Sequence, residues 1–394
     1  MSTVAERLKV LDKLAEGFNK TKGKSLIGRI SQNEDLRNKL KVEFIETPSL
    51  NVNEALGGGW PKGRISIVSG NEDSGKTFHL LETIGNEMKR NPDFIAGWLE
   101  SEGSLSLADI ELFGIDPERF FYLEIDREGA AEQALDAVES ALVTGSINMF
   151  VINSLKCLVP SEEYQKAMGN VQVGLQARMN AKMMRKLTAI VSEHNVAFVM
   201  VQHLTTQIGV MHGDPLTLAG GKSIRYGASL IVDFRKRSIQ DSDPISREEG
   251  LKIGVSVTKN HVVTNRYPYL KTHYYGLFGV GTEKYLETLQ LAIEHGHLVK
   301  AGAFIKVPDE NGNPVVLEDG TKLQWQGASK FRQYCMDNPE FFEELQNKLK
   351  GISSVETLSE EEVNNAKQEN EGNIDDVDTI EDVIADSNKK KKKK

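Results

Sequence analysis

Residues 70–77 constrain this chain more than any other segment. They read Gly-Asn-Glu-Asp-Ser-Gly-Lys-Thr and match the phosphate-binding loop G-x-x-x-x-G-K-[ST]. In residues 64–69, just before the loop, polar and apolar side chains alternate and β-branched residues are frequent, which predicts a strand. Residues 78–83, after the loop, can continue as a helix. This context places backbone N–H groups around a phosphate at a helix N-terminus. A Gly-rich turn that matches by chance is the alternative. We predict that the chain binds a nucleoside triphosphate.

The loop positions have separate expected tasks. Lys76 is expected to reach the β- and γ-phosphates, and the Thr77 hydroxyl is expected to bind Mg²⁺. The glycines let the backbone wrap closely around the β-phosphate. The predicted nucleotide-binding residues of this segment are Gly70, Asn71, Glu72, Asp73, Ser74, Gly75, Lys76, Thr77 and Phe78.

Length and composition set outer bounds. A chain of 394 residues suggests two or three domains, and 39% hydrophobic residues can fill a large core. No apolar run approaches the ~20 residues of a membrane span, so we expect no membrane partner, and we see no signal-peptide pattern. Cys157 and Cys335 lie far apart without metal-ligand spacing, and we expect buried thiols in a reducing cytoplasm.

The formal net charge of −9 hides an uneven distribution. Acidic residues are concentrated between about 352 and 388, in a stretch poor in aromatics that we expect to be disordered, and six lysines, 389–394, close the chain. The remaining body is near neutral and can carry basic patches. The tail is either a solubilising segment or an electrostatic decoy that competes with DNA for basic surfaces.

The chain divides into four predicted regions. Residues 1–45 form an arm with a helix at about Val4–Phe18, too small for its own core and expected to pack on a neighbouring subunit. Residues 46–282 alternate strand and helix patterns, which indicates an α/β core with a mostly parallel central sheet flanked by helices. Residues 283–350 form a small α+β domain, and residues 351–394 are the tail.

Strand and helix patterns are distinct within these regions. In the small domain, helical periodicity appears at Tyr285–His295 and Phe331–Leu349, on either side of a hairpin-like segment, Ala303–Trp325. The core's predicted strands, besides that of the phosphate loop, are Ile95–Glu100, Phe120–Glu124, Met149–Asn153, Ala197–Gln202, Ser229–Arg235 and Ile253–Lys259.

Candidate catalytic residues follow two of these strands, where loops at the carboxyl ends of parallel strands face a ligand. Glu100 and Glu102 can each activate a water, and we favour Glu102, one step further out; an ordinary surface acid is the alternative. Asn153 ends another strand, where an aspartate usually stands. Its oxygen can accept a hydrogen bond from a metal-bound water, but a neutral acceptor is weaker than a charged one. We expect weaker Mg²⁺ binding or slower turnover.

A basic stripe is the clearest sign of a nucleic-acid partner. Arg178, Lys182 and Arg185 are spaced i, i+4 and i+7, so on a helix they share one face. A solvated charged face is the alternative. Gly220-Gly221 would let the chain approach DNA closely, and Arg225 could neutralise a phosphate.

The order of these motifs resembles the RecA recombinases. Glu100-Ser101-Glu102-Gly103 and His203 are similar to the phage branch, the UvsX-like recombinases, which suggests a phage origin. The likeness spans about residues 20–350 in order, through 53–64 ahead of the loop, 169–179, 184–187, 207–215, Gly220-Gly221, 257–260 and 337–340.

The resemblance implies roles for individual positions. Glu102 falls on the family's catalytic glutamate, and Lys76 on its phosphate-loop lysine. His203 stands where bacterial members carry a glutamine that senses the γ-phosphate. Lys259 matches a lysine that reaches the neighbouring subunit's triphosphate, so the site would be complete only inside a filament. The implied metal positions are Thr77 and Asn153.

Two segments, about 160–173 and 204–218, match the family's DNA-binding loops. Both are rich in Gly, Gln, Thr and Met, which suits a protein that grips the DNA backbone without sequence preference. The expected DNA-binding residues are Gly169, Arg178, Arg185, Gln207, Gly209, Gly220, Gly221 and Arg225.

Four departures from the family pattern concern the site. Asn153 replaces an aspartate, and Asp109 stands where bacterial members usually have a tyrosine stacked on adenine. His261 replaces the second of two lysines that act across the subunit interface. Thr205 and Thr206 begin the second loop without positive charge. We expect looser base selectivity, less cooperative hydrolysis and a softer grip on DNA.

The function implied by the resemblance is ATP-dependent homologous recombination. The protein would bind ATP and Mg²⁺, form helical filaments on single-stranded DNA, and exchange strands with a homologous duplex while hydrolysing ATP. Its other partners would be single-strand-binding and loading proteins, and its location a host bacterial cytoplasm. Two alternatives are a RecA-core mediator with little ATPase, motivated by Asn153, and a ring-forming helicase.

Overall fold

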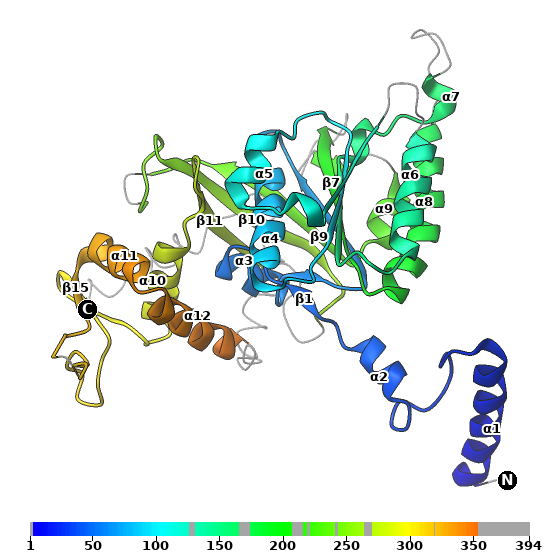
Figure 1. The fold of residues 1–394 in the computed structure, drawn as a ribbon, viewed down its shortest axis with the longest axis horizontal. Coiled ribbons are helices and arrows are strands. Elements are labelled where there is room, and N and C mark those ends of the chain that lie inside the picture. The colour runs from blue at the N-terminus through cyan, green and yellow to red at the C-terminus, as the bar shows by residue number, and fades with distance from the viewer. Residues whose placement is uncertain are drawn as a thin grey trace, which may run out of the picture.

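The computed structural model describes residues 3–125, 131–164, 174–206, 216–218, 221–240, 243–263, 270–318 and 320–353. A central sheet with helices on both faces forms the core, an N-terminal arm extends from one end, and a small C-terminal region lies at the other (Figure 1). The predicted α/β fold class is confirmed.

A ten-stranded sheet runs through the described core. The strands from β9 to β5 are parallel to one another, while β10, β11 and β12 continue the sheet antiparallel. The order is β12 (Gly281–Thr282), β11 (Lys271–Leu277), β10 (Gly250–Asn260), β9 (Leu230–Arg237), β3 (Arg64–Gly70), β7 (Ala197–Thr206), β6 (Met149–Asn153), β4 (Ala96–Glu100) and β5 (Phe120–Glu124), with β8 (Leu216–Leu218) beside β7.

Each face of the sheet has its own apolar core because side chains alternate along a strand. Ile65 and Ile67 of β3 pack with α6 (Ala131–Val143), α8 (Leu175–Glu193) and α9 (Lys222–Gly227). Val68 of the same strand faces the opposite way, toward α3 (Leu50–Leu56), α4 (Lys76–Arg90) and α5 (Leu107–Phe113). Residues 64–69 therefore belong to a strand, β3, that is buried on both faces of the sheet.

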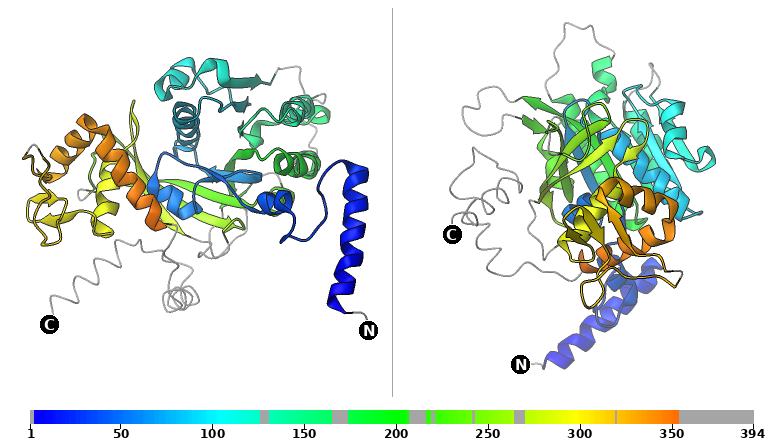
Figure 2. Two further views of the ribbon diagram at one scale, coloured as in Figure 1. Left: turned by 60° about the horizontal axis from the view of Figure 1, so that its bottom comes forward. Right: turned by 90° about the vertical axis from the view of Figure 1, so that its left-hand side faces the viewer.

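The N-terminal arm stands away from the core (Figures 1 and 2). Helix α1 (Val4–Lys22) begins with a capping box between Thr3 and Glu6 and ends four residues beyond the predicted end, where Gly23 in the left-handed conformation is its C-cap. It is followed by α2 (Glu34–Leu40) and by β1 (Phe44–Ile45), which pairs with β2 (Trp60–Pro61) and so joins the arm to the core.

The C-terminal region has a separate core around Leu289, Trp325, Phe331 and Phe342. The helical stretch predicted at Phe331–Leu349 is two helices, because Pro339 lacks the N–H that would continue the first and instead starts the second. The predicted hairpin belongs to a three-stranded sheet. The elements are α10 (Lys284–Glu294), β13 (Val299–Ala301), β14 (Phe304–Lys306), β15 (Gln324–Gln326), α11 (Gly327–Asp337) and α12 (Pro339–Ser353).

Short elements connect the core strands: η1 (Pro117–Arg119), η2 (Leu155–Cys157) and α7 (Ser161–Tyr164). The prediction that both thiols are buried is wrong for Cys157, which is exposed at the end of η2. Cys335 is buried, and burial raises its pKa to about 12. In the described part of the chain, no helix has both the length and the apolar character needed to cross a membrane.

Candidate active site

The phosphate loop lies where the sequence places it, between β3 and α4. Two of its glycines are required by close packing. A Cβ at Gly70 would lie 2.2 Å from the carbonyl oxygen of Phe234, and one at Gly75 would lie 2.5 Å from Cδ1 of Ile253. Gly75 also has φ 78°, in the left-handed region, and is the N-cap of α4. The loop is thus held against β9 and β10 at the N-terminus of α4, where backbone N–H groups favour an anion.

Lys76 is buried, and its ammonium lies over the loop. It donates to the carbonyl oxygens of Asn71 at 2.6 Å and Gly70 at 3.2 Å, and to Ser74 Oγ at 3.2 Å. Burial lowers the pKa of Lys76, and the carboxylates of Glu102 and Asp233 act against that shift. The charge is therefore held at the loop by weak acceptors that phosphate oxygens can replace.

The other loop residues present mainly backbone. Glu72 and Asp73 are exposed, and Asp73 has φ 55°, which supports a tight turn. Thr77 is half-buried on the first turn of α4. The Phe78 side chain is 53% exposed and packs near Phe113 of α5, with ring centroids 5.9 Å apart.

Glu102 and His203 meet at the carboxyl ends of the parallel strands. His203 Nε2 and Glu102 Oε1 are 2.7 Å apart, and the two side chains are only 16% and 22% exposed. His203 pairs with Gly70 in the register of β7 and β3, which sets it beside the phosphate loop. Burial raises the pKa of Glu102, but hydrogen bonds from Ser154 and His203 and the charge of Lys76 outweigh it, and the pKa is lowered. The carboxylate is thus held ionised beside the lysine.

Glu100, the alternative base, has its oxygens occupied. It is 1% exposed and accepts from the indole Nε1 of Trp98 at 2.9 Å, from Asn153 Nδ2 at 3.0 Å, and from the backbone N–H of Glu102 at 2.9 Å. These donors occupy both oxygens and hold the side chain in a buried position. The geometry favours Glu102 as the residue that faces the nucleotide.

The donor set suits Mg²⁺ held largely by phosphates and water. In the residues described, no group of three or more His, Cys, Asp or Glu side chains could hold a metal by itself. Asn153 is fully buried at the end of β6, and within this same set its Oδ1 has no hydrogen-bond partner. A buried oxygen without a partner suits a site where a metal-bound water would donate a hydrogen bond to it. The Thr77 hydroxyl would then be the protein's direct ligand to Mg²⁺.

Lys259 lies at the other side of the core, at the end of β10. Its ammonium donates to the carbonyl oxygens of Arg225 at 2.8 Å, Tyr226 at 3.2 Å and Ala228 at 2.6 Å. Burial lowers its pKa, and the charge of Arg225 adds to that shift. Lys259 is therefore placed at the C-terminal end of α9, outside the Lys76 site of its own subunit.

The three residues of the basic stripe on α8 are all exposed. Lys182 also lines a small pocket against α6 with Glu132 and Asp136, whereas Arg178 and Arg185 do not. Arg225 is exposed on α9, and Gly221, with φ 95°, precedes that helix; a Cβ there would lie 3.0 Å from Cβ of Ala177. The other expected DNA contacts, Gly169, Gln207, Gly209 and Gly220, lie outside the described residues.

Comparisons with known proteins decide the family. The RecA N-terminal domain family matches residues 9–282. The chain is 29% identical over 392 residues to protein RecA of Bdellovibrio bacteriovorus, which covers 99% of this chain and 96% of that protein. It is 30% identical over 369 residues to protein RecA of Syntrophus aciditrophicus (93% and 100% covered) and 30% over 347 residues to that of Brucella suis (88% and 89%). The chain belongs to the RecA family.

As a RecA-family protein, the chain is a DNA-dependent ATPase that uses ATP with Mg²⁺. It forms filaments on single-stranded DNA and carries out ATP-dependent recombination by strand exchange. The function predicted from the motifs is confirmed at this level.

Sequence reasoning missed one RecA-core residue beside the loop. Asp233 of β9 is 5% exposed, accepts from Arg235 Nε at 2.5 Å, and adds negative charge near Lys76. The signal was present, since Asp233 interrupts the apolar run Leu230–Phe234. Asp109, which the sequence likeness sets where a stacking tyrosine is expected, accepts from Ser106 Oγ at 2.6 Å and completes the capping box of α5, whose N-cap is Ser106.

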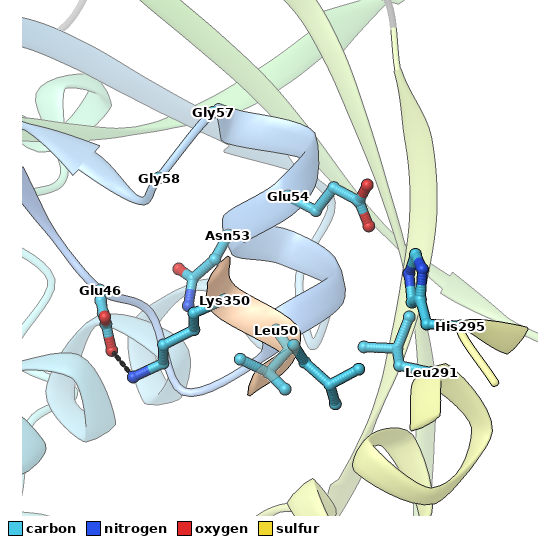
Figure 3. A pocket seen from close by; sticks show the side chains of 10 residues that line it. Glu46, Leu50, Asn53, Glu54, Gly57, Gly58, Leu291, His295 and Lys350 are labelled. Carbon is cyan, nitrogen blue, oxygen red and sulfur yellow. Dashed lines mark hydrogen bonds and ion pairs between the residues drawn. The ribbon is translucent and has the colours of Figure 1, made fainter. Parts of the chain in front are cut away.

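A separate cavity of about 230 Å³ lies between α3 and the C-terminal region (Figure 3). Leu50 and Leu291 line it, and Lys350 and Glu46 form an ion pair of 2.8 Å at its edge. Its described lining comes from α3 and its flanking loops and from α10 and α12, not from the phosphate loop. The cavity therefore belongs to the junction of the two regions and not to the RecA nucleotide site.

Proposed function

We propose that ATP is bound by residues 70–78 and hydrolysed through Glu102, and that this cycle drives strand exchange. The observation that carries the proposal is the Glu102–His203 pair, 2.7 Å apart, next to the ammonium of Lys76. The proposed base, sensor and phosphate-binding cation come from the segment after β4, from β7 and from the first turn of α4, at the carboxyl ends of the parallel strands.

Binding begins at Lys76. A triphosphate entering the loop replaces the carbonyl oxygens of Gly70 and Asn71 as partners of the ammonium, with charge-assisted bonds that are about twice as strong as neutral ones. The N-terminus of α4 adds backbone N–H donors. Mg²⁺, when bound beside Thr77 and Asn153, neutralises charge on the phosphates.

Hydrolysis uses the ionised Glu102. Its carboxylate accepts a proton from the attacking water as the water oxygen bonds to the γ-phosphorus, and the bond to the bridging oxygen breaks to release ADP and phosphate. His203 holds Glu102 in place and continues along β7 toward the second predicted DNA loop, so it couples the state of the γ-phosphate to DNA contact. Lys259 of a neighbouring subunit completes the site by reaching the triphosphate.

Finer assignments follow the same proposal. The regions 1–45, 46–282, 283–350 and 351–394 serve as docking arm, ATPase and DNA-binding core, small α+β domain and acidic tail. DNA is gripped through Gly169, Arg178, Arg185, Gln207, Gly209, Gly220, Gly221 and Arg225. The protein is a phage member of the UvsX-like type, acts in a host bacterial cytoplasm, and works with single-strand-binding and loading proteins.

The test is strand exchange with ATP, Mg²⁺, a single strand and a labelled homologous duplex, beside a heterologous duplex. The unaltered chain should transfer the homologous strand only. Lys76→Ala should abolish nucleotide-dependent filaments and transfer, because the loop loses its phosphate cation. Lys89→Ala, at the other end of α4 and exposed, is the matched control. Filaments of Lys76→Ala with undiminished ATP dependence would refute the assigned site, and single-strand binding without any transfer by the unaltered chain would favour the mediator alternative.

A further inference from the structure

Glu100 is the most fully hydrogen-bonded carboxylate among the candidates at the active-site edge of the sheet. It is 1% exposed. Its Oε2 accepts from Trp98 Nε1 at 2.9 Å and from Asn153 Nδ2 at 3.0 Å, and its Oε1 accepts from the backbone N–H of Glu102 at 2.9 Å. Glu100 therefore contacts both the candidate metal-side residue and the chain segment that carries the candidate base.

The hydrogen bond from Asn153 Nδ2 to Glu100 Oε2 fixes the orientation of the Asn153 side-chain amide. Glu100 and Asn153 are directly opposite in the register of β4 and β6. A carboxylate accepts hydrogen bonds only, so it selects the NH₂ side of the amide and turns Oδ1 away from itself. Oδ1 is buried and has no partner in the described part of the chain, and the reversed amide would place two acceptors face to face.

We propose that Glu100 is a positioning residue of the ATPase site, which turns the Asn153 oxygen toward the bound Mg²⁺ and its water and anchors the Glu102 backbone. This inference rests on the proposed function. The negative charge that the family's aspartate would bring to position 153 is supplied here from position 100, one strand away. Residues that orient metal-side groups in this way are worth about 10- to 100-fold in metal affinity.

The arrangement has a consequence for the family residue. Asn153→Asp alone removes the Nδ2 donor and places a second carboxylate about 3 Å from Glu100, close to the distance now spanned by their hydrogen bond. Restoring the family aspartate should therefore impair this chain. Combining it with Glu100→Gln again gives one donor and one acceptor between the two positions. Recovery should be partial, because Trp98 Nε1 then faces an amide NH₂ and loses its acceptor.

The experiment is a double-mutant cycle of Glu100→Gln and Asn153→Asp in the full-length chain. Binding of a fluorescent ADP analogue is titrated with and without Mg²⁺, the Mg²⁺ concentration for half-maximal ATPase is determined, and urea unfolding is measured without either ligand. Each single variant should need about tenfold more Mg²⁺, with Mg²⁺-free nucleotide binding changed by less than about twofold. The double variant should need less Mg²⁺ than the two single effects multiplied.

Glu124→Gln is the matched control, since Glu124 pairs with Glu100 in the register of β5 but is exposed. It should behave as the unaltered chain. An unchanged Mg²⁺ requirement in a folded Glu100→Gln protein, or single effects that simply multiply, would overturn the proposal. If Glu100→Gln does not fold, Asn153→Ala is used as the second test because it removes Oδ1, the oxygen that Glu100 is proposed to orient. An unaltered Mg²⁺ requirement in Asn153→Ala would also overturn the proposal. Failure of the proposed function is a separate result, namely ATP hydrolysis that survives Lys76→Ala.

Discussion

His79 is a buried side chain whose polarity works against the fold. It follows the phosphate loop on α4, is 2% exposed, and lies among Trp60, Phe234 and Tyr274 with ring centroids 5.0–6.3 Å away. Neither ring nitrogen has a hydrogen-bond partner among the described residues, and burial lowers the pKa of His79 to about 3. The site thus holds a neutral imidazole in an aromatic setting.

Replacing His79 by leucine should stabilise the protein by about 1–3 kcal/mol, the cost of leaving buried polar atoms unpaired. The folded pKa lies below the ordinary value of 6.5, so below pH 6.5 the unfolded state binds a proton that the folded state does not. The destabilising effect of His79 is therefore smallest above pH 6.5 and grows as the pH falls toward 3. The gain of His79→Leu should therefore be larger at pH 5.5 than at pH 7.5 in urea unfolding. His261→Leu, at an exposed position, is the control, and equal gains at both pH values would contradict the argument.

At this scale the sequence predicts residues whose task is local. Gly75, Lys76 and Thr77 lie at adjacent positions and need only the turn that their own segment forms. The bond between Glu100 and Asn153 could not be predicted, because it depends on the register of two strands that are 53 residues apart in the chain. We prefer Glu102 to Glu100 because it lies further beyond the end of β4, and the hydrogen bonds that occupy both oxygens of Glu100 give that choice a physical reason.

At the scale of elements, one carboxylate joins the C-terminal region to the core. Glu287 of α10 accepts from Ser49 Oγ at 2.5 Å and from the backbone N–H groups of Leu50 at 3.1 Å and Asn51 at 3.2 Å. It therefore caps the N-terminus of α3 from a distant part of the chain. Burial raises its pKa to about 7, the hydrogen bonds oppose that shift, and the charge of Glu82 adds to it.

This cap should make the junction depend on pH. The folded pKa lies above the ordinary 4.5, so the Glu287 contribution to stability is fully present below pH 4.5 and is lost as the pH rises through about 7. Glu287→Gln cannot ionise, and its unfolding midpoint should fall less between pH 5 and pH 8 than that of the unaltered chain. Glu294→Gln, exposed on the same helix, should keep the original pH dependence. A Glu287→Gln protein with that same dependence would show that the carboxylate is not the cause.

Elements were predictable where one segment carries the whole signal. Strand β6 has the predicted bounds, Met149–Asn153, because its apolar run is bounded by polar residues. The break between α11 and α12 was missed although Pro339 marks it, since apolar spacing continues across the proline. Strand β11 was missed as well, because Lys271–Leu277 mixes polar and aromatic residues and is stabilised by its antiparallel pairing with β10.

At the scale of the whole molecule, the exposed apolar face of α1 is the feature that a single subunit does not explain. Val10 is 68% exposed, Leu11 57%, Leu14 55% and Phe18 46%, although the helix is well capped. The arm extends away from its own core (Figure 2). A helix with such an exposed apolar face indicates a partner surface. In a RecA-family filament, the neighbouring subunit supplies a surface that can cover this face.

Val10→Ser combined with Leu14→Ser should therefore weaken filament assembly and leave the subunit intact. Burying each side chain contributes about 1.5–3 kcal/mol, so removing both should lower subunit affinity at least about 100-fold. ATP-dependent co-sedimentation with single-stranded DNA measures filament assembly, while binding of a fluorescent ADP analogue tests whether the phosphate loop is intact.

Lys9→Ser combined with Lys13→Ser is the control, because it has the same spacing on the same exposed helix and removes no apolar side chain. This pair should sediment normally. Equal loss in both pairs would mean that the helix acts through its charge or its stability, and full sedimentation of the Val10 and Leu14 pair would mean that α1 is not the docking element.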